Sequence, residues 1–163
     1  MSLGRHLAAV VACPGLVTVA VPALIVWSTG ANVEPLGLPG LPLIALGLLL
    51  IVRTIALFAT LGRGTLAPWD PTTRLVVSGP YRRVRNPMIS GVLFVLLGEA
   101  ALFASPALLL WFALVWAVNA VYIPLVEEPG LQRRFGEDYA RYAAHVPRWI
   151  PRLRPWDGQE PSR

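Results

Sequence analysis

The chain has 163 residues, of which 55% are hydrophobic and 14% are charged, and its mean hydropathy of +0.59 excludes an ordinary soluble globular protein. Its formal charge of +5 comes entirely from arginine, because the sequence contains no lysine. With this apolar content, anionic lipid headgroups are a better partner for the basic residues than nucleic acid is.

Four apolar segments are long enough to cross a bilayer, which takes roughly 20 helical residues. They span residues 7–27, 41–61, 87–104 and 107–126. Ser105-Pro106 is expected to form the turn between the last two, because proline starts a helix readily and continues one badly. A cleaved signal peptide is a poor explanation of the first segment, because its apolar stretch is too long and no convincing small-residue cleavage site follows it.

The arginines alternate between the two sides of these segments. Arg5 precedes the first segment, five arginines lie between the second and the third, and seven follow the fourth. The other two connections contain none. By the positive-inside rule, this pattern predicts four crossings of a bacterial or other cell membrane, with both termini cytoplasmic. The expected fold is an all-α integral membrane protein with four transmembrane helices, a cytoplasmic loop and an amphipathic C-terminal helical segment.

The two arginine-rich segments, 62–88 and 127–163, would then meet at one membrane surface. Glycines and prolines in the first indicate an ordered loop. The second carries apolar residues at helical spacing between charged ones, namely Leu131, Phe135, Tyr139, Tyr142 and Val146. This spacing predicts an amphipathic helix that lies along the membrane or over the loop, with a break at Gly136.

Two polar motifs flank the last pair of apolar segments. The first is GPYRRVRNPM at 79–88, followed by Gly91, and the second is EEPGLQRRFGEDYARYAAHVP at 127–147. They resemble the GPYRxxR(H/N)PxYxG and EExxLxxxFGxxYxxYxxxVP motifs of the isoprenylcysteine carboxyl methyltransferase family and its phospholipid methyltransferase relatives. We treat the chain as one domain with three parts: helices one and two (1–61), the motif-bearing region that carries the resemblance (62–151) and a tail (152–163).

The resemblance implies a membrane methyltransferase that uses S-adenosyl-L-methionine. It implies catalytic roles for Arg85, Asn86 and Glu128. The donor-binding residues that it implies are Tyr81, Arg85, Asn86, Gly91, Glu127, Glu128, Tyr139 and Tyr142. No metal is expected, because one cysteine and two scattered histidines provide no ligand cluster.

The chemistry of these residue types is compatible with that donor. Arginine binds a carboxylate through paired, charge-assisted hydrogen bonds. Glu127 or Glu128 could bind the donor's amino group or a ribose hydroxyl, and Tyr139 and Tyr142 could contact its adenine ring. Gly91 could let the cofactor approach a helix backbone closely. In this interpretation Arg85, Asn86 and Gly91 form one wall of the site, while Arg82 and Arg83 hold the loop at the lipid headgroups.

Two positions depart from the family motif and bear on the methyl acceptor. Asn86 stands where prenylcysteine-type members often have histidine, and asparagine cannot take up a proton at physiological pH. Ile89 replaces the usual tyrosine and makes the local wall more apolar. A prenylcysteine carboxylate, a phospholipid amine and a small lipophilic thiol or acid all remain possible acceptors, so methylation at O, N or S stays open.

The alternative function is that of a non-enzymatic four-helix membrane scaffold or ligand-binding subunit. It explains the apolar segments and the basic loops equally well. It does not explain why two polar motifs flank one helical hairpin on the same side. A transporter is disfavoured because the four segments show no inverted repeat.

Overall fold

The computed structural model of the chain describes residues 14–61 and 75–158. Within these two ranges the regular structure is entirely helical, in agreement with the predicted fold class. The α-helices are α2 (Val21–Thr29), α3 (Gly40–Leu61), α4 (Pro87–Leu102), α5 (Pro106–Tyr122) and α6 (Glu128–His145). Shorter π-helical and 3-10 elements are Leu16–Ala20, Pro35–Gly37, Gly79–Arg82 and Ile123–Glu127.

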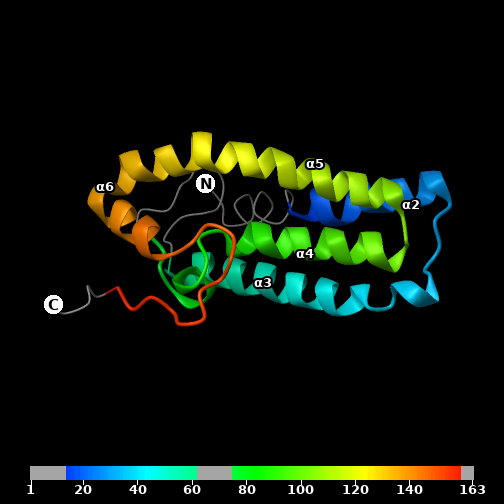
Figure 1. Cartoon of the computed structure of the whole chain (residues 1–163), viewed down its shortest axis with the longest axis horizontal. Helices are drawn as coiled ribbons and strands as arrows, with labels where there is room; N and C mark the ends of the chain where they lie inside the picture. The colour runs from blue at the N-terminus through cyan, green and yellow to red at the C-terminus, as the bar shows by residue number, and fades with distance from the viewer. Residues whose placement is uncertain (1–13, 62–74, 159–163) are drawn as a thin grey trace.

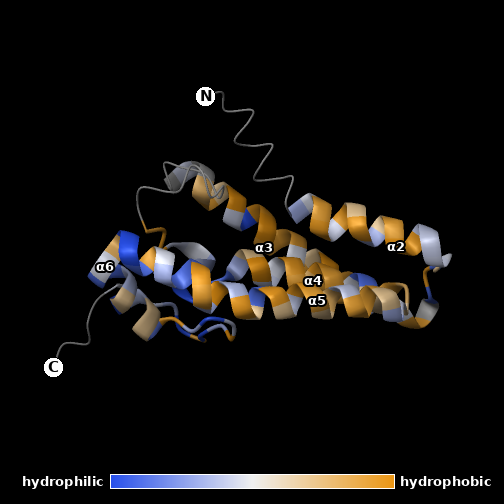
Figure 2. Cartoon of the chain, turned by 90° about the horizontal axis from the view of Figure 1, so that it is seen from above, coloured by the Kyte–Doolittle hydropathy of each residue, from blue (hydrophilic) through white to orange (hydrophobic). Residues whose placement is uncertain are grey.

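Helices α3, α4 and α5 run alongside one another, and α6 lies at one end of this bundle (Figure 1). The segment before α4 and the segment after α6 lie at that same end (Figure 1). Figure 2 shows mainly hydrophobic residues along α2 to α5 and hydrophilic ones concentrated on α6. The polar motifs are therefore gathered at one end of an apolar bundle, as the sequence predicts.

Two helical runs are long and apolar enough to cross a membrane, Gly40–Phe58 and Pro106–His145. The other two apolar helices, Leu16–Thr29 and Pro87–Leu102, are shorter. At 1.5 Å per residue, a helix of 16 residues extends about 24 Å, less than the thickness of about 30 Å of the hydrocarbon core. Part of the first predicted segment, residues 7–13, lies outside the described residues. Four apolar helices occur near the predicted positions, and the four-crossing topology stays a prediction.

Glycines allow α3 and α4 to pack closely, and this pair makes the most extensive helix contact in the described structure. A Cβ atom at Gly91 would lie 2.8 Å from the carbonyl oxygen of Gly47, too close for a side chain. Gly98 stands in the same relation to Gly40, at 2.7 Å. Small residues permit such close helix approach within apolar surroundings. The expectation that Gly91 offers its backbone to a cofactor is therefore corrected, because α3 occupies that space.

Replacement of Gly91 by alanine is expected to lower the melting temperature of the detergent-solubilised protein by about 5 °C. The added methyl group would contact backbone atoms of α3, which cannot move as a side chain can. The matched control is Gly130→Ala in α6, where a Cβ atom meets nothing within 4 Å. Equal melting temperatures for the two variants would contradict the close helix packing.

The chain from α5 into α6 is one helical run, Pro106–His145, interrupted at two places. The π-helical turn Ile123–Glu127 contains Pro124, which has no N–H group and cannot complete the regular hydrogen-bond pattern. Gly136 has φ 54° and ψ −126°, a conformation that glycine adopts far more readily than other residues. The predicted break at Gly136 is confirmed, and it redirects the second half of α6.

Candidate functional site

Arg85 and Asn86 lie immediately before α4, where the chain segment that follows α6 holds them in place. The backbone nitrogen of Arg85 donates to the carbonyl oxygen of Pro147 at 2.9 Å. Asn86 occupies the N-cap position of α4, but its side chain does not cap the helix. Its amide nitrogen instead donates to the carbonyl oxygen of Arg148 at 3.4 Å. Pro147, the last residue of the second motif, and Arg148 after it thus hold Arg85 and Asn86 of the first motif.

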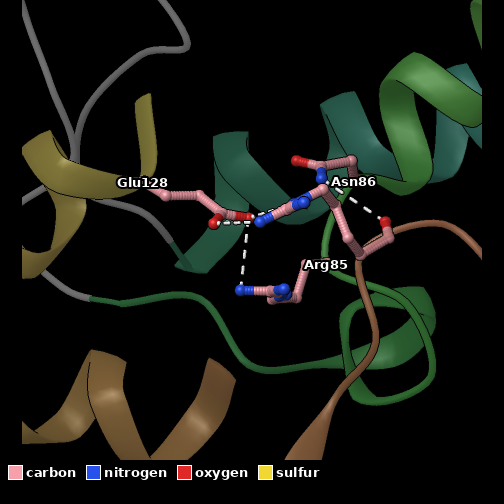
Figure 3. A network of polar contacts seen from close by, with 4 residues as sticks. Arg85, Asn86 and Glu128 are labelled. Carbon is pink, nitrogen blue, oxygen red and sulfur yellow. Dashed lines mark hydrogen bonds and ion pairs between the residues drawn. The ribbon is translucent and has the colours of Figure 1, made fainter. Parts of the chain in front are cut away.

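A salt bridge between Arg85 and Glu128 joins the two motifs at their charged residues. Arg85 Nη1 lies 3.2 Å from Glu128 Oε1, and only 14% and 15% of the two side chains are exposed. A charge buried to this degree needs an opposite charge beside it, because water no longer solvates it. Figure 3 shows Arg85, Asn86 and Glu128 within one network of polar contacts. The structure therefore brings the three proposed catalytic residues together.

Arg148 belongs to the same network, and the sequence interpretation did not identify it. Its Nε donates to Glu128 Oε1 and its Nη2 to Glu128 Oε2, each at 2.7 Å. These bonds raise the pKa of the Arg148 guanidinium and form the bidentate geometry that arginine makes with carboxylates. One signal could have indicated it: Arg148 directly follows the Val146-Pro147 end of the second motif.

Arg82 and Arg83 bind the C-terminal segment of the chain, and their expected role as headgroup anchors stays a prediction. Arg82 Nε donates to the carbonyl oxygen of Trp156 at 2.5 Å, and Arg83 Nη1 donates to that of Leu153 at 3.1 Å. The backbones pair as well, since Trp156 N donates to Arg82 O at 2.8 Å and Arg152 N to Arg83 O at 2.9 Å. The two arginines hold the tail against the first motif.

Tyr139 and Tyr142 are buried in an apolar cluster with Val146 and Trp156. Only 4% of Tyr139 and 3% of Tyr142 is exposed. The Tyr142 hydroxyl donates to the carbonyl oxygen of Tyr81 at 2.8 Å, and burial raises the pKa of this hydroxyl. Both rings thus pack in this cluster, and the Tyr142 hydroxyl fixes α6 on the first motif. The expected adenine contacts stay a prediction.

Tyr142→Phe is expected to destabilise the protein by about 1–2 kcal/mol without changing its helix content. The substitution removes the only donor that the described structure gives to the Tyr81 carbonyl group and leaves the ring packing in place. The measurement is thermal unfolding in detergent, with Tyr122→Phe as the control because that ring is 49% exposed. A Tyr142→Phe variant as stable as the parent would show that the bond contributes nothing.

Two other predicted site residues, Tyr81 and Glu127, lie outside the charged network of Arg85, Glu128 and Arg148. Tyr81 packs its ring edge-on against Phe58 of α3, with 5.6 Å between ring centroids. Burial raises the pKa of the Tyr81 hydroxyl, which keeps it protonated. The Glu127 side chain is exposed, whereas Glu128 beside it is not. Of the two glutamates that the sequence left as alternatives, Glu128 is the one that contacts Arg85.

The charged network is suited to a ligand that carries an anionic oxygen. Arg85 Nε is buried and, among the residues that the structure describes, has no hydrogen-bond partner. A buried guanidinium N–H left without an acceptor loses free energy that a ligand carboxylate can restore. The N-terminus of α4, with its partial positive charge, follows directly after Asn86. The Glu128 carboxylate beside it suits an amino group or a hydroxyl.

Comparison with known proteins agrees with the motifs. The family model described as phospholipid methyltransferase matches residues 37–138, more than half of the chain. Protein-S-isoprenylcysteine O-methyltransferase B of Arabidopsis thaliana is 37% identical over 79 residues, which are 48% of this chain and 40% of that relative's length. No solved structure matches the chain significantly. The resemblance seen in the two motifs is confirmed, and the chain belongs to the phospholipid methyltransferase family.

Proposed function

We propose that this protein is a membrane methyltransferase that transfers the methyl group of S-adenosyl-L-methionine to a lipophilic or amphiphilic acceptor. Membership of the methyltransferase family supports an enzymatic role. The observation that carries the proposal is the Arg85–Glu128 salt bridge, which unites the two motifs at one end of an apolar bundle. A scaffold protein would have no need for a buried charged network with an unsatisfied donor at that place.

The residues of this network fit the amino-acid part of the donor. Arg85, with its buried and unpartnered Nε, would hold the donor carboxylate, and Glu128 would accept from the amino group or a ribose hydroxyl. The bound donor supplies an electrophilic methyl group. The chain's own contribution is to align donor and acceptor and to exclude water, since a methyl transfer of this kind is an in-line displacement.

The network favours an acceptor that arrives without a proton to lose. The amide of Asn86 cannot take up a proton, and its nitrogen is already bound to the Arg148 carbonyl oxygen. Arg85 and Arg148 engage three of the about four acceptor positions of Glu128, and the position that remains is the one proposed for the donor. A carboxylate acceptor, such as that of a prenylated cysteine, needs no base. The prenylcysteine relative named above supports this class, and the family model supports a phospholipid amine as the second candidate.

The orientation that we propose places this end of the bundle at the cytoplasmic face, with both termini in the cytoplasm. The donor would then enter from the cytosol and the acceptor from the bilayer. Support comes from the arginine distribution along the sequence and from the exposed apolar surface of the helices, where Leu110 and Leu125 are 72% and 70% exposed. Side chains of this kind suit contact with lipid tails.

Two measurements test the proposed function. Isothermal calorimetry with purified protein in detergent should detect binding of S-adenosyl-L-methionine. Radiolabelled methyl transfer should then be assayed with a synthetic farnesylated cysteine, with phosphatidylethanolamine and with a membrane lipid extract. Label in the farnesylcysteine ester supports the carboxylate acceptor, and label in the phospholipid supports the amine. Folded protein that binds no donor would favour the scaffold alternative.

A further inference from the structure

One residue outside both recognised motifs, Arg148, contacts polar side chains of both. The main-chain carbonyl oxygen of Arg148 accepts from the Asn86 amide at 3.4 Å. Its guanidinium forms two parallel hydrogen bonds, each of 2.7 Å, with the Glu128 carboxylate. The preceding Pro147 accepts from the backbone nitrogen of Arg85. The backbone of Arg148 thus contacts the first motif, and its side chain binds Glu128 of the second.

The bidentate pair determines which way the Glu128 carboxylate faces. A carboxylate offers about four acceptor positions. Oε1 accepts from Arg148 Nε and also lies 3.2 Å from Arg85 Nη1. Within residues 14–61 and 75–158, Oε2 accepts one hydrogen bond, from Arg148 Nη2. One acceptor position on Oε2 therefore remains. The two bonds from Arg148 keep the carboxylate from rotating and from presenting this position to Arg85.

We infer that Arg148 is a positioning residue for the methyl donor. It holds Glu128 with one acceptor position on Oε2 available, beside Arg85, whose buried Nε has no hydrogen-bond partner among the described residues. Without Arg148, the single contact with Arg85 would let the carboxylate turn and close onto that guanidinium. This inference rests on the proposed function, because it assigns Arg148 a role at the donor site.

The test measures binding of S-adenosylhomocysteine, the demethylated product of the donor, which keeps the carboxylate and the amino group but cannot react. Arg148→Gln should raise the dissociation constant of S-adenosylhomocysteine by about 10- to 100-fold, the effect of losing a hydrogen-bonded charge pair. Arg148→Lys keeps the charge but not the paired geometry, and it should recover part of the affinity. In methyl transfer, the KM for the donor should rise more than the KM for the acceptor.

Arg154→Gln is the matched control, because Arg154 lies in the same tail with its side chain exposed. It should bind S-adenosylhomocysteine as the parent does. Equal affinity of the parent and the folded Arg148→Gln variant would overturn the inference, and so would an equal loss in Arg154→Gln. If Arg148→Gln fails to fold, Arg148→Lys decides: parental affinity overturns the inference. A parent protein that binds no S-adenosylhomocysteine would instead overturn the proposed function and this inference with it.

Discussion

Glu128→Gln is expected to lower kcat/KM for methyl transfer by about 100-fold or more. The glutamine amide replaces one carboxylate oxygen with an N–H donor, which would face the guanidinium groups of Arg85 and Arg148. Two buried or half-buried positive charges would then lack their shared anion. Breaking a buried ion pair in this way costs about 3–5 kcal/mol, so part of the loss should appear as lower stability.

The assay must separate this loss of stability from a loss of function. Melting temperature and helix content are measured first, and kinetics are measured below the unfolding range. Glu137→Gln is the control, because it makes the same chemical change at an exposed position of α6. Folded Glu128→Gln protein with parental kcat/KM would show that Glu128 has no part in the reaction and would remove the centre of the proposed site.

The sequence was sufficient for the helices and for the end of the bundle at which the motifs meet. The helices follow from local features of the chain, namely the length of each apolar segment, the Ser105-Pro106 turn and the glycine at position 136. The Ser105 hydroxyl accepts from the Leu108 backbone nitrogen at the start of α5, as a helix cap does. Gly136 takes a positive φ. Such features depend on near neighbours in the chain, so they can be predicted without knowledge of the tertiary fold.

The predictions were less successful where a role depends on partners far away in the sequence. Tyr139 and Tyr142 show the same helical spacing whether they line a pocket or a core, and only the tertiary structure shows that both pack in one cluster with Trp156. Gly91 could equally have faced a ligand or another helix, and Gly47 decides that. Arg82 and Arg83 were expected to contact lipid headgroups, and their spacing in the sequence does not show that their guanidinium groups bind carbonyl groups of the tail.

Arg148 was missed for a related reason. Its role comes from a bidentate contact with Glu128, 20 positions earlier in the chain, and no spacing rule connects a tail residue with the start of a helix. A glutamate in an apolar protein needs a cation beside it, and the seven arginines that follow position 126 were the available candidates.

Arg85→Ala should reduce methyl transfer by about 100-fold or more and should abolish detectable donor binding. The substitution removes the buried guanidinium, including the Nε that has no partner among the described residues. The backbone hydrogen bond from position 85 to Pro147 does not depend on the side chain, and Arg148 still neutralises Glu128. The fold and the membrane topology should therefore persist while the anion-binding group is lost.

Arg85→Lys distinguishes the need for charge from the need for geometry, since lysine carries the same charge without the planar set of donors. We expect weak activity in this variant, with a raised KM for the donor. Arg133→Ala, an exposed position on α6, is the control for general loss of positive charge and should retain parental kinetics. Cysteine-accessibility mapping of both termini checks the topology. Parental donor affinity in folded Arg85→Ala protein would refute the role of Arg85, and Glu128 would then need another partner in binding.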